Sequence, residues 1–297
     1  MILVTSANGR VGRLVIEALV KAGLNEIRAI DINPNSYSLL ELGVKEVIVG
    51  DAFDEKVLDK AMDGIDQVVY VPPMLTYFES EMANLACDLA IKHQVKQYIY
   101  LSVTHPNLTK LLQHKQKLAA EEHLKYVGFQ NQFNFTILQP LHYTHNVLVK
   151  DMVNTGKYVN FKPLDRKLGY VDGRDVAEVV AKVLMDGDKH KYATYELCGD
   201  IHLSINEIAD MYREISGLPL EVKYTPREEL FIDFNNFVGV GNDSYGKAAV
   251  MAIRDVYNEY GFDANCNVLE WLLGRKSTSM EQYLRDELNK LGITPIK

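Results

Sequence analysis

The sequence predicts an α/β protein built on a doubly wound parallel sheet, with a smaller, mainly helical C-terminal lobe. Three observations support this fold class. A strand, a glycine turn and a helix start follow one another within residues 1–12. Short apolar segments then alternate with amphipathic helical segments as far as residue 140, and most of the apolar segments end on a polar residue or a proline. Alternation of this kind is typical of parallel sheets covered by helices on both faces.

The first unit of the alternation is a strand, a helix and a second strand. The apolar residues from Leu14 to Ala22 keep helical spacing, and the helix is expected to end at Gly23. A second short apolar strand follows at residues 27–30 and ends on Asp31. A β-α-β unit with a glycine turn after its first strand is the start of a dinucleotide-binding fold.

The glycine turn fits the spacing G-x-x-G-x-x-G, with Ser6 in the first glycine position and Gly9 and Gly12 in the others. The glycines let a pyrophosphate approach the N–H groups at the start of the helix. We expect Ser6 to fit only with a negative φ. A turn that is merely structural is the alternative. The expected cofactor contacts in this loop are Ser6, Asn8, Gly9, Arg10, Val11 and Gly12.

Asp31 lies nineteen residues after Gly12, near the offset at which a carboxylate accepts hydrogen bonds from an adenosine ribose. Its charge repels a 2′-phosphate, which favours NAD. Arg10 and Arg13 leave NADP open, because a guanidinium pairs with that phosphate. The alternative for Asp31 is a solvated turn residue before Asn33.

Further polar and proline residues follow the later strands. Strands are expected at residues 46–49, 66–71, 97–101 and 133–138, and helices at 55–62, 79–93 and 111–126. Ligands of such folds bind at the carboxyl ends of the strands. Asp51, Pro72, Ser102 and Pro140 stand at those ends and are expected to contact the cofactor. Asp51 could meet the adenine edge or serve as a turn and helix cap.

The domain prediction places a dinucleotide-binding domain at 1–140, with 170–200 returning to it, and a smaller lobe at 141–169 and 201–297. A seventh strand is expected at 192–197, and Ser204 and Glu207 form a capping box before a helix that ends at Gly217. The remainder from Glu221 is expected to be helical, apart from a polar, glycine-rich interruption at 239–246. Whether that interruption is a lid or a connector stays open.

Composition excludes several function classes. The formal net charge of −8 and the pI near 5.5 argue against direct nucleic-acid binding. Three scattered cysteines predict neither disulfides nor a zinc site, and His142 and His145 lack a third nearby ligand, so no metal is expected. No basic leader and no long apolar run are present, which predicts a cytoplasmic protein that does not associate with a membrane.

Several motifs along the whole chain resemble the NmrA-like group of atypical short-chain dehydrogenases/reductases. Each is weak alone, but their order and spacing are specific. They are Val49–Asp54 leading to Ala61–Asp66, His114–Lys117 followed by Glu121–Leu124, Thr136–Pro140 with Asn146, Tyr170–Asp175, and Asn267–Lys276. The resemblance implies a nucleotide-binding lobe and a smaller substrate lobe.

The resemblance also implies that Lys117 contacts the nicotinamide ribose and that Ser102 lies near the nicotinamide. Reductases of the wider superfamily place a tyrosine four residues before this lysine, but here the residue is Gln113, which cannot act as an acid. His142 and Tyr143 follow the sixth predicted strand and are the candidate proton donors.

Two function classes therefore stay open. The first is an NAD(P)H-dependent oxidoreductase that reduces a quinone-like or other small electrophile by hydride transfer, and we favour it. The second is a non-catalytic dinucleotide redox sensor that acts through a protein partner.

Overall fold

The chain forms two compact units in a computed structural model that describes residues 1–296 except 74, 200, 227–228 and 230–243. Unit 1 comprises residues 1–109, 113–140 and 173–197. Unit 2 comprises residues 110–112, 141–172 and 198–297.

Unit 1 contains a seven-stranded sheet in the order β3-β2-β1-β4-β5-β6-β9. Every neighbouring pair is parallel. The predicted doubly wound parallel sheet is therefore confirmed. The strands are β1 (Ile2–Val4), β2 (Ile27–Asp31), β3 (Glu46–Val49), β4 (Gln67–Tyr70), β5 (Gln97–Leu101), β6 (Phe135–Pro140) and β9 (Thr194–Leu197).

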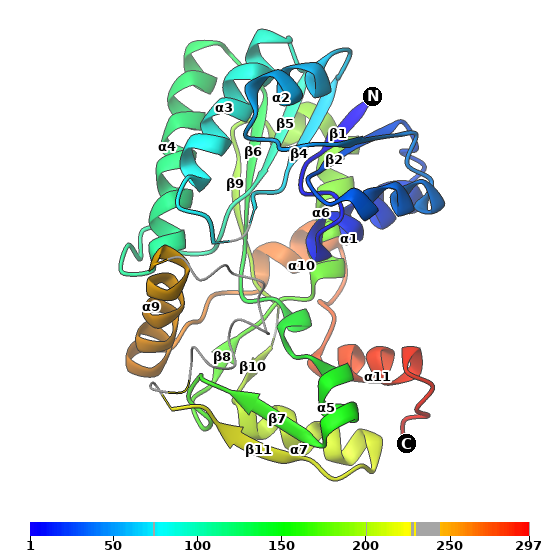
Figure 1. Cartoon of the computed structure of the whole chain (residues 1–297), viewed down its shortest axis with the longest axis vertical. Coiled ribbons are helices and arrows are strands. Elements are labelled where there is room, and N and C mark those ends of the chain that lie inside the picture. Colours follow the sequence, from blue (N-terminus) through cyan, green and yellow to red (C-terminus); the bar gives the residue numbers. More distant parts are fainter. Residues whose placement is uncertain (74, 200, 227–228, 230–243, 297) are drawn as a thin grey trace. The chain divides into compact units, whose positions relative to one another are not determined.

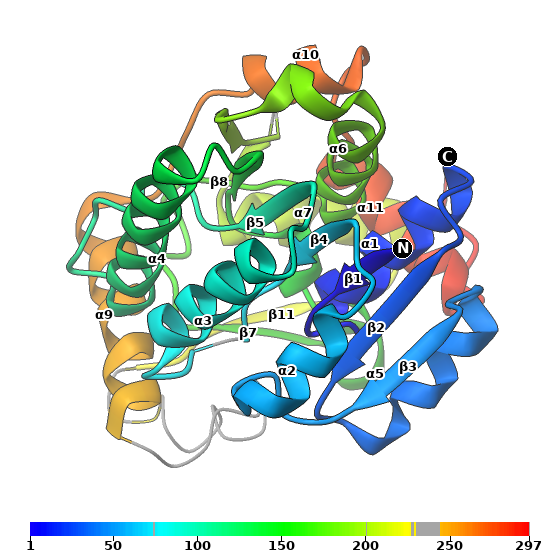
Figure 2. The same ribbon diagram turned by 90° about the horizontal axis from the view of Figure 1, so that it is seen from above.

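Helices cover both faces of this sheet. Figures 1 and 2 show α2, α3 and α4 on one face and α1 and α6, which pack together, on the other. Such two-sided cover is what right-handed crossovers between parallel strands produce. The helices are α1 (Arg10–Lys21), α2 (Glu55–Met62), α3 (Glu79–Lys92), α4 (Leu112–Gln130) and α6 (Gly173–Asp186), with 3-10 helices η1 (Pro34–Leu42) and η3 (Gly187–His190).

The sequence pattern explains this packing. All residues of β5 and β6 are buried, as expected for central strands covered on both faces. Helix α1 buries Val15, Ile16 and Leu19 on one face, which are positions that share a face at helical spacing. These buried residues belong to the core of unit 1.

Unit 2 contains two small sheets and several helices. Strands β8 (Leu168–Gly169) and β10 (His202–Leu203) are antiparallel. Strands β7 (Lys157–Asn160) and β11 (Glu221–Tyr224) are parallel. The helices are η2 (Thr144–Asn146), α5 (Val149–Thr155), α7 (Ile205–Ser216), α9 (Ser244–Tyr260), α10 (Asn267–Leu273) and α11 (Met280–Lys290).

Of the local predictions for unit 2, one is confirmed, one is wrong at its start, and one lies mostly outside the described residues. The capping box of Ser204 and Glu207 is confirmed, and α7 ends at Gly217 with a φ of 67°. The helical prediction from Glu221 is wrong at its start, because β11 pairs there with β7 over four residues. The interruption at 239–246 lies outside the described residues as far as 243, and Ser244 already begins α9.

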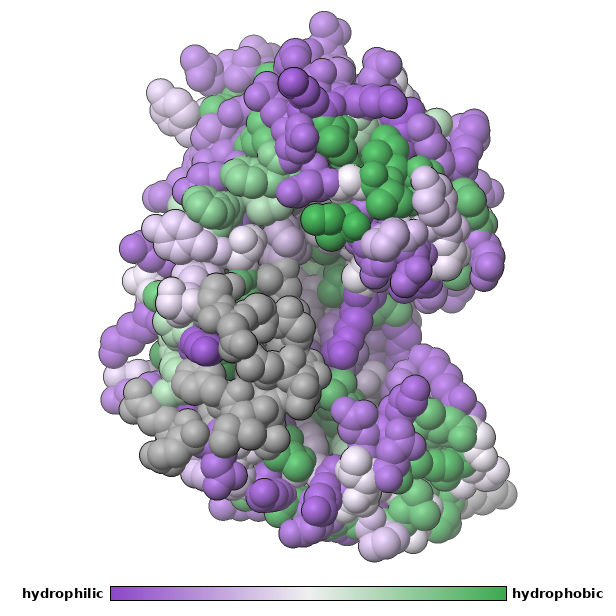
Figure 3. All heavy atoms as spheres, in the orientation of Figure 1, coloured by the Kyte–Doolittle hydropathy of each residue, from purple (hydrophilic) through white to green (hydrophobic). Residues whose placement is uncertain are grey.

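The surface is mostly hydrophilic on the face that Figure 3 displays, with small, scattered apolar patches. Within the described ranges, no helix combines the length and the apolar character needed to cross a bilayer.

Candidate functional site

The carboxyl ends of the parallel strands of unit 1 lie at one edge of the sheet. Asp31 and Pro140 are the last residues of β2 and β6. Asp51, Pro72 and Ser102 follow β3, β4 and β5 within two residues. The fold therefore brings these predicted residues to the edge at which such sheets bind ligands.

The loop between β1 and α1 presents a helix N-terminus at this edge. Gly9 is the N-cap residue and has no side chain that could cap the helix. The N–H groups of the first turn, to which Arg10, Val11 and Gly12 belong, have no intrahelical acceptors. The first turn contains no acidic residue. Together these features fit an anionic group such as a pyrophosphate.

Ser6 makes the tight turn that precedes this N-terminus. Its φ is 43°, so the expectation of a negative φ is wrong. The left-handed conformation lets the Ser6 carbonyl accept a hydrogen bond from the N–H of Gly9 at 3.0 Å. A non-glycine residue in this region costs about 1 kcal/mol. Ser6 therefore adopts the left-handed backbone conformation that favours glycine at the first position of the motif.

Gly12 provides the close approach of α1 to the loop. A Cβ atom at this position would lie 2.3 Å from the carbonyl oxygen of Ser6 and 2.8 Å from the Cα of Ala7. Both are backbone atoms, so they cannot yield as a flexible side chain would. Gly12 is thus required by the packing of the loop itself, before any ligand is considered.

Asp31 is tied to the same loop. Its Oδ2 accepts a hydrogen bond from the N–H of Asn8 at 2.9 Å, and its Oδ1 accepts one from Asn33 at 2.8 Å. The contact with Asn33 matches the turn alternative, whereas the contact with Asn8 fixes the carboxylate beside the glycine loop. Each oxygen keeps capacity to accept a further bond.

A cation lies near this carboxylate. Arg13 donates from Nε to Asn8 Oδ1 at 3.1 Å and from Nη2 to Ser38 Oγ at 2.7 Å. Asn8 therefore contacts both Asp31 and Arg13. Together the two side chains offer a carboxylate that can accept from a ribose hydroxyl and a guanidinium that can bind a phosphate. Arg10 is exposed on the first turn of α1.

Asp51 acts as a local turn residue, because its Oδ1 accepts from the N–H of Phe53 at 2.9 Å, while Asp54 caps α2. Phe53 belongs to a cluster of exposed rings that the sequence analysis did not identify. Its ring stacks on Phe78 with centroids 5.8 Å apart, and Tyr77 meets Phe78 edge-on at 5.2 Å. These rings offer faces on which a flat group could pack.

Ser102 is part of a buried polar network. Its Oγ donates to Glu121 Oε1 at 2.5 Å, and Gln139 Nε2 donates to the same oxygen at 2.7 Å. Glu121 is almost completely buried and also pairs with Lys125. The Ser102 hydroxyl proton is thus committed to a carboxylate, although the oxygen can still accept.

Lys117 pairs with a buried acid that the sequence analysis missed. Its Nζ contacts the carboxylate of Glu79, the first residue of α3. Burial raises the pKa of Glu79, and the Lys117 charge opposes that rise. One helical turn before Lys117, the side-chain oxygen of Gln113 is buried and has no hydrogen-bond partner among the described residues. An uncompensated acceptor of this kind fits a site where a ligand group donates.

His142 and Tyr143 lie in unit 2, where both are partly buried. The His142 imidazole contacts the amine of Lys162, and burial lowers the pKa of His142 well below its ordinary value. Burial lowers the pKa of Lys162 to about 7. Burial also raises the pKa of Tyr143, which makes its phenol a weaker acid. Lys162 follows β7 in a segment that carries no functional motif.

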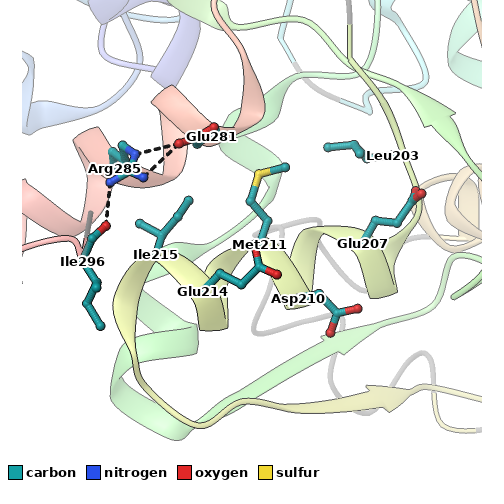
Figure 4. Close-up of a pocket in the computed structure, with 9 residues that line it drawn as sticks. All are labelled: Leu203, Glu207, Asp210, Met211, Glu214, Ile215, Glu281, Arg285 and Ile296. Carbon is teal, nitrogen blue, oxygen red and sulfur yellow. Dashed lines mark hydrogen bonds and ion pairs between the residues drawn. The ribbon is translucent and has the colours of Figure 1, made fainter.

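A groove of about 460 Å³ lies in unit 2 between α7 and α11 (Figure 4). Three of its carboxylates already have cationic partners: Glu207 pairs with Lys167, Asp210 with Arg213, and Glu281 with Arg285. None of the predicted site residues lines it. We therefore assign no function to this groove.

The parallel sheet, the glycine turn and the open start of α1 define unit 1 as a Rossmann-type nucleotide-binding fold. The comparison with known families agrees: the chain belongs to the NmrA-like family, whose model matches residues 1–286.

Two individual proteins have sequences similar to that of the chain. The chain is 28% identical over 235 residues to a (4-alkanoyl-5-oxo-2,5-dihydrofuran-3-yl)methyl phosphate reductase of Streptomyces griseus, covering 78% of each chain. It is 25% identical to quinone oxidoreductase 2 of Escherichia coli, covering 97% of this chain and 99% of the relative.

Among solved structures, the triphenylmethane reductase of Citrobacter sp. in complex with NADP(H) is similar, with a TM-score of 0.78, 22% identity, and 96% and 99% of the two chains covered. The NADPH complex of an Escherichia coli quinone oxidoreductase gives a TM-score of 0.77 and 22% identity over 97% and 100%. At these identities the likeness shows the shared fold.

Proposed function

We propose that the protein is an NAD(P)H-dependent oxidoreductase that transfers a hydride to a quinone-like or other small electrophile. The observation that carries this proposal is the start of α1, where an N-terminus without a side-chain cap stands beside the Asp31 carboxylate. The arrangement supplies a place for a pyrophosphate and an acceptor for a ribose hydroxyl. The names of the two curated relatives, a reductase and a quinone oxidoreductase, support the same function.

In this proposal the dinucleotide is held by the loop and by the strand ends. The N–H groups of the first turn of α1 bind the pyrophosphate, Asp31 accepts from the adenosine ribose, and Lys117 contacts the nicotinamide ribose. The reduced nicotinamide supplies the hydride. Ser6, Asn8, Gly9, Arg10, Val11, Gly12, Asp51, Pro72, Ser102 and Pro140 are proposed as further contacts.

The choice between NAD and NADP depends on two neighbouring groups. Asp31 favours NAD, as the sequence predicts. Arg13 supports NADP, because its guanidinium contacts the same Asn8 as Asp31 does. Both similar solved structures named above contain NADP(H) or NADPH. We propose that the protein accepts both cofactors and that Arg13 carries the affinity for the 2′-phosphate.

The proton that accompanies the hydride needs a source other than Gln113. His142 and Tyr143 remain proposed donors. Burial lowers the pKa of His142, which disfavours the imidazolium, and raises the pKa of Tyr143, which makes its phenol a weaker acid. A quinone lessens this need, because solvent can protonate its reduced oxygen. This supports a quinone-like electrophile over a substrate that requires a strong internal acid.

The proposal is tested by following the oxidation of NADH and NADPH optically against a panel of quinones. Turnover with any acceptor supports the enzyme and excludes a pure sensor. Tight binding of a dinucleotide without turnover on the panel would contradict the enzyme and favour the redox sensor with a protein partner.

Two variants test the proposed roles of Arg13 and Asp31 in cofactor binding. Arg13→Met should weaken NADPH binding about tenfold, because a charge-assisted hydrogen bond contributes about 1.5–3 kcal/mol, and leave NADH binding unchanged. Asp31→Ala should weaken NADH by a few-fold to about tenfold and raise the ratio of NADPH to NADH affinity. Lys21→Met, which removes an exposed cation at the far end of α1, serves as the control. Equal loss of both cofactors in Arg13→Met would refute its assignment to the 2′-phosphate.

A further inference from the structure

Helices α3 and α4 lie side by side on one face of the unit 1 sheet (Figures 1 and 2). Among the described residues, three pairs of side chains make polar contacts between them. Lys117 pairs with Glu79, Ser80 Oγ donates to Gln116 Oε1 at 2.5 Å, and His123 Nε2 lies 2.7 Å from Asp88 Oδ1. The first two contacts lie near the start of α3. The third lies near its C-terminal end and differs from them, because a thiol lies next to it.

That thiol belongs to Cys87. The Cys87 Sγ, an Asp88 carboxylate oxygen and a His123 ring nitrogen all lie within 4.8 Å of one another. Cys87 is 2% exposed, whereas the side chains of His123 and Asp88 are 27% and 55% exposed. A buried sulfur therefore lies beneath a His-Asp pair that solvent can reach. Across the described part of the chain, this is the one place where three such ligands come together.

We propose that Cys87, Asp88 and His123 bind a thiophilic divalent cation, Zn²⁺ in the first instance, with solvent in the fourth position. Sulfur, imidazole and carboxylate are the ligand types that zinc accepts, and three protein ligands with one open position form a common type of zinc site. The proposal goes beyond the oxidoreductase function and replaces the expectation, drawn from the scattered cysteines, that the chain binds no metal.

The distances allow such a site after a small adjustment. Bonds of about 2.3 Å to sulfur and about 2.1 Å to nitrogen and oxygen place tetrahedral ligand atoms roughly 3.5 Å apart. His123 and Asp88 must separate by somewhat less than 1 Å, and the other separations, which are at most 4.8 Å, must shorten by no more than roughly 1 Å. The more exposed side chain, that of Asp88, can move most readily. The bound cation would clamp α3 to α4.

The binding step balances in protons. When the cation binds, the S–H bond breaks, the sulfur–metal bond forms, and one proton leaves to solvent.

The molecule contains its own control. His93 Nε2 lies 2.9 Å from Asp59 Oδ1, which is the same kind of surface pair without a thiol. Lys92 shares the Asp59 carboxylate. If a His-Asp pair alone attracted the cation, this second pair would do so too.

The experiment titrates Co²⁺ into the full-length, reduced, metal-free protein and records its absorption spectrum. We expect a near-ultraviolet thiolate-to-cobalt band that saturates at about one equivalent, with visible bands typical of tetrahedral cobalt, and competition by Zn²⁺. Cys87→Ala should abolish the charge-transfer band. His123→Gln, a change at the surface that should not disturb the core, should weaken binding at least about tenfold. His93→Gln and Cys266→Ser should leave the titration unchanged.

Two outcomes would overturn the proposal: no charge-transfer band in the wild-type protein, or the same band in Cys87→Ala. An unchanged titration in His123→Gln would equally remove His123 from the site. If Cys87→Ala does not fold, as judged by circular dichroism, the charge-transfer band of the wild-type protein and the His123→Gln titration still decide the matter.

Discussion

Two buried lysines, one in each unit, have opposite surroundings. The Lys117 side chain is 13% exposed and pairs with Glu79, which is 1% exposed. Lys162 is 6% exposed, and its amine contacts the imidazole of His142 and lies 5.8 Å from the centre of the Tyr170 ring. No carboxylate of the described chain pairs with Lys162. Burial beside another base, with no acid to offset it, lowers the pKa of Lys162 to about 7.

The largest expected effect comes from removing the amine of unit 1. Lys117→Met leaves the Glu79 carboxyl buried without its cation, and we expect the free energy of unfolding to fall by about 3 kcal/mol at pH 8. Lys162→Met, the matched change in unit 2, should alter it by less than about 1 kcal/mol, because no acid loses a partner. Urea denaturation of the two variants measures both effects.

A double variant controls this prediction. Lys117→Met combined with Glu79→Gln removes the buried acid as well and should recover much of the lost stability. Equal losses of unfolding free energy in Lys117→Met and Lys162→Met would contradict the contrast between the two lysines, since they would mean that both side chains stabilise the fold through packing alone.

The second expected effect is the contribution of Lys162 to the pH dependence of the free energy of unfolding. The pKa of this lysine is lower in the folded chain than its ordinary value of 10.5. Between these values the unfolded chain binds more protons, so the contribution of Lys162 makes the free energy of unfolding rise with pH. Below pH 7 both states are protonated and this dependence disappears.

Denaturation curves at pH 7, 8 and 9 measure this dependence. Relative to Lys162→Met, the wild-type protein should gain about 1 kcal/mol per pH unit over this range. Parallel pH profiles of the two proteins would show that Lys162 keeps its charge and that the contrast between the lysines is wrong.

The smallest effect concerns the amide next to His142. Asn146 Nδ2 lies 3.5 Å from His142 Nε2, which is too long for a strong hydrogen bond. We expect Asn146→Ala to change the free energy of unfolding by less than about 0.5 kcal/mol. A clearly larger loss would identify the amide, and not the amine of Lys162, as the main partner of the imidazole.

Much of the fold could be predicted because its signals are local. Alternating apolar segments, a glycine turn and a capping box each depend on neighbouring residues, and the parallel sheet follows from their order. The strand at Glu221–Tyr224 was missed because it is stabilised by pairing with Lys157–Asn160, which lies far away in the sequence. The left-handed φ of Ser6 was missed because serine rarely adopts it.

The candidate site could be predicted only where one segment supplies it. The glycine loop and Asp31 belong to a single β-α-β unit, and the structure joins them through Asn8. Glu79, Lys162 and the group formed by Cys87 and His123 acquire their roles from partners on other elements. A lone glutamate, lysine or cysteine carries no signal in the sequence, because its burial and its partner are products of folding.

The glycine loop has a further consequence for the kinetics of association. Internal hydrogen bonds already fix it: Gly9 donates to Ser6 at 3.0 Å, Arg13 to Gly9 at 3.0 Å, and Ala7 to Ile30 at 3.2 Å. A dinucleotide that meets this loop has little backbone to order, so the entropic cost of binding falls mainly on the ligand. Differences in affinity among cofactor analogues should therefore arise in their dissociation rates, with association rates nearly constant.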